Sequence, residues 1–200
     1  MVAIRKVPHR MTVAEFLDWN PDDGTGALWQ LRDGEPEMMA PASDAHGSIQ
    51  ATLLRLIENH LVARGSRCRT VVAPGVIPRV RSDRNMLVPD LGITCAPPSG
   101  GRSLPEPLVL IEVLSPSNEA ETRANVRAYT TIPSVREILV VSSTAMAAEL
   151  LRRRVDESWP EQPELIGTEG ELRLEAIGFA APLRDAYRTS GLVKGASWEQ

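Results

Sequence analysis

The chain has 200 residues, of which 42% are hydrophobic and 24% charged, a composition typical of one soluble globular domain. The formal net charge is −4, which argues against a large permanent nucleic-acid-binding surface but is compatible with a local basic strip. No stretch approaches the roughly 20 apolar residues of a membrane span, and residues 1–16 lack the apolar run of a secretory signal. We therefore expect a cytoplasmic protein without membrane contact.

The N-terminal segment, residues 11–45, contains signals for a short helix and a hairpin. Thr12 is followed three residues later by Glu15, which is the capping-box pattern at the start of a helix. A turn is expected at residues 20–24, Asn-Pro-Asp-Asp-Gly. Two short strands are expected around the Asp-Gly dipeptide at 33–34, because this dipeptide favours a tight hairpin turn.

The next segment, residues 46–145, has the strongest hydrophobic periodicity. Apolar residues recur at helical spacing in its first part, whereas the later runs are β-branched and bounded by Pro, Gly and Ser. The expected elements are, in chain order, a helix over 48–63, strands within 68–80, 86–95 and 107–115, a helix over 119–131 and a strand over 136–143.

The pattern weakens beyond residue 145. Within 146–185 we expect three short strands of a partly exposed sheet, in residues 148–155, 163–168 and 171–178, followed by a loop over 186–200. No internal repeat, low-complexity block or linker divides the chain, so residues 1–200 are expected to form a single domain of the α/β (α+β) class.

The cysteines and histidines do not predict a zinc site. Cys68 and Cys95 match no metal-ligand spacing, and His9, His46 and His60 are scattered along the chain. In a cytosolic protein two free thiols are favoured over a disulfide, although a disulfide is compatible with the count.

Two acidic residues lie inside apolar strand-like runs. Asp90 follows Pro89 in MLVPDLGIT, and Glu112 interrupts PLVLIEVLS. A buried, ionised and unpaired carboxylate costs several kcal/mol, so each acid needs a cation, a metal or hydrogen-bond donors. Acids at adjacent strand ends can share a Mg²⁺ ion; alternatively, one caps a turn and the other forms a buried ion pair. The occurrence of both acids, in this order, favours the metal site.

These runs carry a resemblance to a known family. The segments VPDLGIT (88–94) and LVLIEVLSPSNEAETRANVRAYTTIPSVREILVV (108–141) resemble the Uma-two family, a group of restriction-endonuclease-like proteins of the PD-(D/E)XK superfamily. MTVAEFLDW (11–19) and LWQLRDGEPEMMAPAS (28–43) are similar to that family too, and the resemblance covers about residues 11–185. It implies a restriction-endonuclease-like core with a mixed central β-sheet, flanking helices and additional N- and C-terminal strands.

The resemblance also implies metal-assisted hydrolysis of DNA phosphodiesters. Asp90 and Glu112 would hold Mg²⁺ or Mn²⁺, with the backbone carbonyl of Val113 as a further ligand. A lysine normally completes this set, and in its usual place, two residues after the glutamate, this chain has Leu114.

In the Uma-two family the lysine lies on the following helix, four residues before a tyrosine. Counting back from Tyr129 gives Asn125, which carries no charge. Glu121, one turn earlier, matches an acid of the family and shares the helix face of Asn125. Arg123 and Arg127 are each two residues from Asn125 and therefore point to different faces of the helix.

Two further positions are assigned by the resemblance. Gln30 stands where the family commonly has a glutamate, a change that would weaken any second metal site. His46 matches a family histidine and could contact a phosphate or a water; alternatively, it bonds to local backbone at a helix start. Tyr129 is expected to pack against the sheet.

The sequence thus predicts a Mg²⁺-dependent DNA endonuclease that is attenuated by Asn125. The alternative is a catalytically inactive nuclease-fold protein that acts as a nucleic-acid-binding or protein-assembly module. A structural homodimer is a third hypothesis, because the C-terminal part contains many apolar strands. The run Arg152-Arg153-Arg154 could contact a nucleic-acid backbone or form a solvated edge strand.

Overall fold

The computed structural model describes residues 10–19 and 27–193. The turn expected at 20–24 and the two lysines of the chain, Lys6 and Lys194, lie outside these ranges. No helix in the described ranges is long and apolar enough to cross a membrane.

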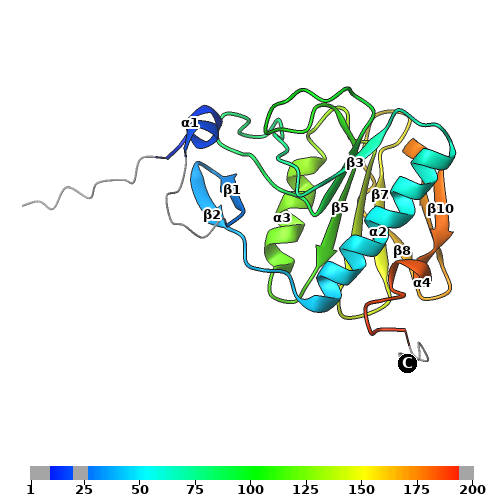
Figure 1. Ribbon diagram of the computed structural model, residues 1–200. Helices are drawn as coiled ribbons and strands as arrows, with labels where there is room; N and C mark the ends of the chain where they lie inside the picture. The colour runs from blue at the N-terminus through cyan, green and yellow to red at the C-terminus, as the bar shows by residue number, and fades with distance from the viewer. Residues whose placement is uncertain (1–9, 20–26, 194–200) are drawn as a thin grey trace, which may run out of the picture.

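The centre of the molecule is a six-stranded mixed sheet (Figure 1). Its strands are β3 (Arg69–Val72), β4 (Leu91–Thr94), β5 (Pro107–Leu114), β6 (Glu137–Ser142), β7 (Ala148–Arg152) and β8 (Glu164–Ile166). They lie side by side in the order of the sequence, and every pair is antiparallel except β5–β6. The parallel pair requires a crossover, which is made by helix α3 (Glu119–Tyr129).

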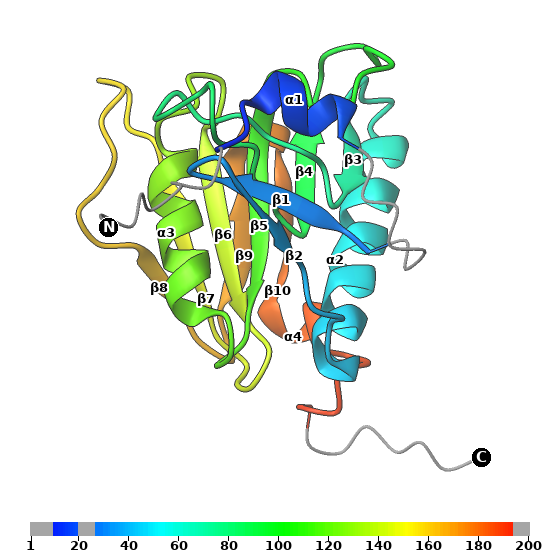
Figure 2. The ribbon, with the colours of Figure 1, turned by 90° about the vertical axis from the view of Figure 1, so that its left-hand side faces the viewer.

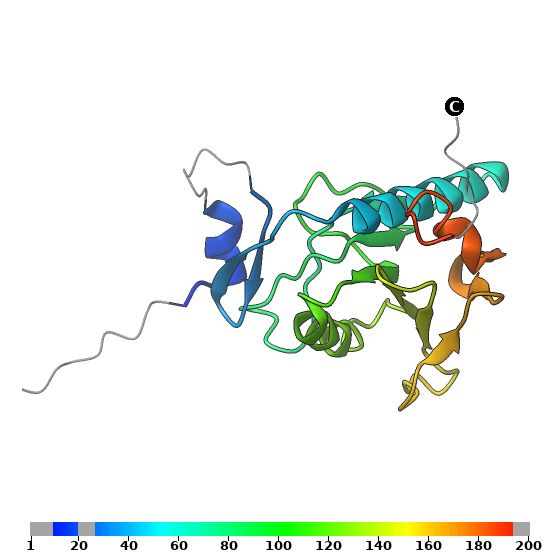
Figure 3. The same ribbon diagram turned by 90° about the horizontal axis from the view of Figure 1, so that it is seen from below.

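Helices cover both faces of the sheet (Figures 2 and 3). Helix α2 (Asp44–Ala63) packs on one face and α3 on the other. Along β5, Ile111 and Val113 belong to the core under α2, whereas Leu110 belongs to the core under α3. Because both faces of β5 are buried, its sequence is a continuous apolar run, and any charged residue in it lies inside the protein.

The C-terminal elements complete the layer that contains α2. They are β9 (Glu171–Leu174), the short 3-10 helix η1 (Glu175–Ile177), β10 (Phe179–Pro182) and α4 (Leu183–Ala186). β9 and β10 form an antiparallel hairpin, and their buried residues join the α2 core. We did not predict β10, because its sequence, Phe-Ala-Ala-Pro, has weak strand propensity and depends on its partner β9.

The N-terminal elements form a lobe beside the sheet (Figures 1 and 2). The lobe consists of α1 (Val13–Asp18), β1 (Trp29–Arg32) and β2 (Glu35–Met38). The capping box is confirmed, since Thr12 accepts from Glu15 N and donates its own N–H to the Glu15 carboxylate. The β1–β2 turn uses Asp33 and Gly34 at positive φ, as the Asp-Gly pattern predicts.

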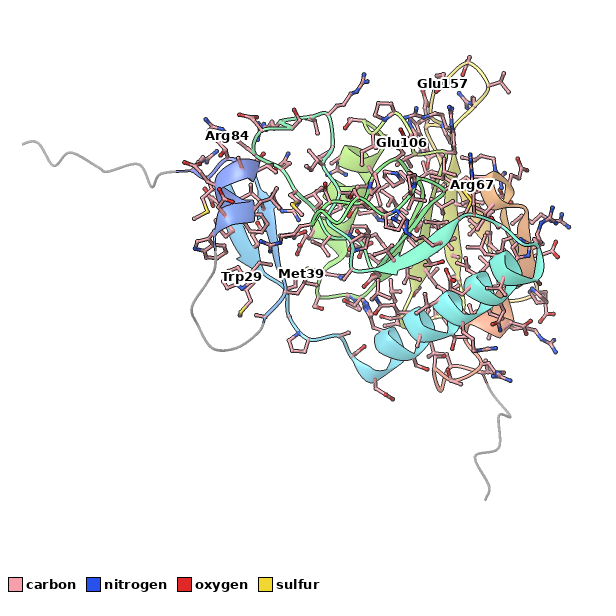
Figure 4. All side chains as sticks on the ribbon, turned by 45° about the horizontal axis from the view of Figure 1, so that its top comes forward. Trp29, Met39, Arg67, Arg84, Glu106 and Glu157 are labelled. Atoms are coloured by element: carbon pink, nitrogen blue, oxygen red, sulfur yellow. A yellow bond between two sulfur atoms is a disulfide. The ribbon has the colours of Figure 1, made fainter. Side chains whose placement is uncertain are left out.

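The lobe is joined to the rest of the molecule through the segment before β4. Leu31 and Met86 exchange two backbone hydrogen bonds of 2.8 and 2.9 Å, and both side chains are buried with Phe16. Gly34 N also donates to the carbonyl of Arg84, which lies at the lobe in Figure 4. These contacts hold the β1–β2 hairpin beside α3.

The order predicted for the central elements, helix–strand–strand–strand–helix–strand, is confirmed by α2, β3, β4, β5, α3 and β6. The strand expected within 68–80 is shorter than predicted, because β3 ends at Val72. Ala73 has a positive φ of 46° and is followed by Pro74, and both features interrupt a ladder.

The prediction of two free thiols was wrong. Cys68 and Cys95 form a disulfide and are both half-buried. The antiparallel β3–β4 register pairs Arg69 with Thr94, so the residues immediately beyond this pair face each other. The two cysteines are 27 residues apart in the sequence, and only the register of β3 and β4 brings them together.

Candidate active site

The two acids of the apolar strands lie on the same face of the sheet. In the antiparallel β4–β5 pair, Leu91 is opposite Ile111, so Asp90, immediately before β4, is opposite Glu112. Residues directly opposite each other in an antiparallel pair project to the same side. The nearby charge of Asp90 contributes to raising the pKa of Glu112, as expected for two carboxyl groups on the same side of adjacent strands.

The carboxylate and the backbone carbonyl of Asp90 are both hydrogen-bonded to neighbouring groups. The Nε2 atom of His46 is 2.8 Å from Oδ1 of Asp90, and the Val113 N–H donates to Oδ2 at 2.6 Å. Gln50, one turn further along α2, donates to the backbone carbonyl of Asp90. The His46 ring therefore bonds to Asp90 in the predicted site, while its main-chain N–H donates to the Ser43 side chain at the start of α2.

Glu112 is buried between β5 and α3. Its Oε1 accepts a 2.7 Å hydrogen bond from the hydroxyl of Tyr129, and the amide of Asn125 lies 3.5 Å from the same oxygen. Burial, followed by the nearby charge of Asp90, raises the pKa of Glu112 to about 8. Burial likewise raises the pKa of Tyr129 well above its ordinary value. Tyr129 packs against the sheet as predicted, and it also bonds to the site.

The backbone of Val113 faces Asp90. Its N–H bonds to the Asp90 carboxylate, whereas the carbonyl of the next residue, Leu114, accepts from Ser143 at the other side of the strand. The N–H and C=O of one strand residue point to the same side. The Val113 carbonyl is thus directed toward the Asp90 side of β5, which is compatible with the ligand role that we predicted for it.

Gln30 and Glu121, which the family resemblance singled out, contact each other. The amide nitrogen of Gln30 donates to the carboxylates of Glu121 and Glu37. Glu121 also helps to raise the pKa of Glu112, so this group is electrostatically connected to the site. The β1–β2 hairpin therefore contributes its side chains to the same site as α3.

The sequence analysis missed Arg32. Its Nε donates to Glu37 at 2.9 Å and its Nη2 donates to Glu121 at 3.0 Å. Period-2 alternation places Arg32 on the same strand face as Gln30, and this was the signal that could have identified it.

Three of the other arginines that we considered are engaged elsewhere. Arg123 forms a two-pronged ion pair with Glu149 on β7. Arg152 pairs with buried Glu137, and Arg153 donates to three backbone carbonyls between Thr130 and Pro133. β7 also lies inside the sheet rather than at its edge. The predictions of a nucleic-acid contact or a solvated edge strand are therefore not supported for Arg152 and Arg153.

The site contains more hydrogen-bond acceptors than donors. Besides the two carboxylates, the side-chain oxygens of Asn125 and Gln30 are buried and have no donor in the described part of the chain. Within residues 10–19 and 27–193, no three His, Cys, Asp or Glu side chains converge as a complete metal cage. Mg²⁺ does not require one, since it commonly takes one or two carboxylates and completes its shell with water and phosphate oxygens. The oxygen-rich pair Asp90–Glu112 fits such an ion.

A mixed sheet with one acid just before β4 and one on the adjacent strand β5, and with α3 as the crossover between β5 and β6, defines a protein of the restriction-endonuclease-like nuclease fold. Residues 13–183 match the model of the Uma2 family, described as "Putative restriction endonuclease", and the chain belongs to this family.

Two known proteins are similar to this chain over most of its length. A Synechocystis protein, the uncharacterized protein slr1290, is 29% identical over 185 residues, which cover 90% of this chain and 92% of that protein. The crystal structure of a "putative nuclease belonging to DUF820" from Anabaena variabilis matches with a TM-score of 0.70 and 14% identity, over 90% of this chain and 99% of that one. At this identity, the second match shows the fold alone.

Proposed function

We propose that this protein is a Mg²⁺- or Mn²⁺-dependent DNA endonuclease that is attenuated by the uncharged Asn125. The observation that carries the proposal is the pair Asp90–Glu112, two interacting carboxyl groups on one sheet face beside buried oxygens without donors. The family assignment supports a nuclease. DNA as substrate and the identity of the metal belong to the proposal.

Each residue of the site has a physical role in this proposal. Asp90 and Glu112 would hold the cation, together with the Val113 carbonyl. When bound, a divalent cation lowers the pKa of an attacking water and offsets charge that develops on the phosphate. His46 and the Val113 N–H fix the orientation of Asp90, while Tyr129 fixes that of Glu112. Asn125 offers one hydrogen bond but no charge.

The test is nicking of supercoiled plasmid by the wild-type protein with Mg²⁺ or Mn²⁺. We expect slow nicking that stops on addition of EDTA and is absent from Asp90→Asn, which keeps the size of the side chain but removes its charge. Nicking that persists in Asp90→Asn, or absence of nicking in both the wild type and Asn125→Lys, would contradict the proposal.

The pKa of Glu112 predicts a pH-dependent stability of the metal-free protein. The pKa of Glu112 is about 8 in the folded state, against an ordinary value of 4.5. Between pH 4.5 and about pH 8, the folded state therefore keeps a proton on Glu112 that the unfolded state has lost. The free energy of unfolding should therefore fall as pH rises from about 4.5 to about 8. Glu112→Gln should remove this dependence and raise stability at pH 8.5 by on the order of a few kcal/mol.

Thermal unfolding in EDTA at pH 5.5 and pH 8.5 checks this prediction. Glu119→Gln is the matched control, because Glu119 lies in the first turn of α3 and its side chain is 58% exposed. An equal pH dependence in Glu112→Gln and the wild type would show that Glu112 is not the group responsible.

The alternative function is a nuclease-fold module that binds nucleic acid or a protein partner without catalysis. The neutral side chain of Asn125 and the net charge of −4 favour it. It predicts that Asp90→Asn changes no function of the protein. A DNA affinity that falls with salt would distinguish nucleic-acid binding from protein assembly.

A further inference from the structure

One cation lies close to the site. Arg32, the last residue of β1, holds its guanidinium between Glu37 on β2 and Glu121 on α3, at 2.9 and 3.0 Å. Its side chain is 22% exposed, so it is neither buried in the core nor free in solvent. The two carboxylates restrict the guanidinium to one position between the hairpin and the helix.

Arg32 is connected to the site through two residues, Glu121 and Tyr129. Glu121, which binds Arg32, contributes to the raised pKa of Glu112. Arg32 itself acts on Tyr129: burial raises the pKa of this hydroxyl, and the charge of Arg32 opposes that rise. The hydroxyl of Tyr129 is 2.7 Å from Glu112. Glu121 lies one turn before Asn125 on α3, and the amide of Asn125 lies 3.5 Å from Oε1 of Glu112, so the contact with Glu121 places Arg32 at the rim of the site.

The guanidinium retains donors for a ligand. Of the five N–H groups of an arginine, Nε–H and one Nη2–H are used by the two glutamates. The three that remain can form a two-pronged bond to a phosphate, for which the planar guanidinium is well shaped. Its charge is also retained at any pH that the protein tolerates.

We infer that Arg32 binds the phosphate group attacked at the Asp90–Glu112 pair and supplies the positive charge that is absent from position 125. This inference rests on the proposed nuclease function and assigns a catalytic residue to it. Glu37 and Glu121 are positioning residues, because they act by holding Arg32. The guanidinium neither gains nor loses a proton; it stabilises negative charge on the phosphate oxygens while water replaces the leaving oxygen.

The test compares Arg32→Gln with Arg32→Lys. Gln keeps a polar side chain with amide donors but removes the charge, whereas Lys restores the charge without the planar, two-pronged donor geometry. The control is Arg173→Ala on β9, which removes a charge from a 67% exposed side chain that is paired with Glu171. β9 and β10 lie at the other end of the molecule from β1 (Figure 1).

Two quantities are measured for each variant: plasmid nicking with Mn²⁺, and the salt dependence of binding to a 20-bp duplex in Ca²⁺. We expect Arg32→Gln to lower nicking by about 10²–10³-fold and to reduce the slope of log K against log salt by about 0.9, the loss of one phosphate contact. Arg32→Lys should recover part of both, and Arg173→Ala should change neither. In the Asn125→Lys background, Arg32→Gln should lower nicking less, because the new ammonium supplies positive charge to the same phosphate.

The outcomes separate the inference from the proposed function. An unchanged slope and unchanged nicking in Arg32→Gln, with Asp90→Asn inactive, would overturn the role of Arg32 and leave the nuclease intact. A reduced slope with no nicking by the wild type or Asn125→Lys would support the phosphate contact and overturn the nuclease. An unchanged slope without any nicking would overturn both.

Discussion

Replacing Asn125 with lysine is expected to raise the nicking rate by about 10²–10³-fold, the effect of adding one charged group to a preorganised site. Asn125 is buried, and its amide nitrogen lies 3.5 Å from Oε1 of Glu112. An ammonium group at this position would face the Glu112 carboxylate and favour its ionised form, which is the form that binds a cation. It would also place positive charge beside the attacked phosphate.

The matched control is Asn125→Met, which has a side chain of similar length to lysine and no charge. Nicking by both variants is measured with Mn²⁺, and each is combined with Asp90→Asn. A gain in Asn125→Met as large as that in Asn125→Lys would show that volume, and not charge, limits the wild type. Unchanged activity in both variants would mean that the missing positive charge at position 125 does not limit the nicking rate.

The largest expected effect on stability comes from Glu137, the first residue of β6. Its side chain is only 1% exposed, and it accepts hydrogen bonds from Arg152 at 2.8 Å and from the backbone N–H groups of Glu175 and Ala176 at 3.0 Å. A single carboxylate thus connects the central sheet to the start of η1. Glu137→Ala should lower the free energy of unfolding by about 3–5 kcal/mol, because it leaves one partly buried charge and two N–H groups unpaired.

For a chain of this length, the expected loss corresponds to a fall in Tm of roughly 6–20 °C. The control is Glu164→Ala, which removes the 59% exposed carboxylate lying 3.6 Å from the same arginine and should change stability by no more than about 0.5 kcal/mol. Similar Tm values for both variants would show that burial of Glu137 contributes little.

Much of the fold and part of the site could be predicted from local patterns. Helix α2 and the strands around β4, β5 and β6 carry strong periodicity, because each buries a continuous apolar surface whatever its neighbours are. Asp90 and Glu112 were identifiable for the same reason, since a carboxylate inside an apolar strand needs a partner. The resemblance to the family added Gln30, His46, Glu121 and Asn125, and the structure brings His46 to Asp90 and Asn125 to Glu112.

The amino-acid sequence by itself determined the order of the central elements and the two acids of the site, because these depend on hydrophobic spacing within short segments. Only the tertiary structure decided the Cys68–Cys95 disulfide, the bond between Arg32 and Glu121 and the pairing of Glu137 with Arg152. Each of these contacts joins different elements, and its geometry depends on strand register or on where the hairpin packs. Such relations arise only when the sheet assembles, which is why the contact of Arg32 with α3 was absent from the sequence prediction.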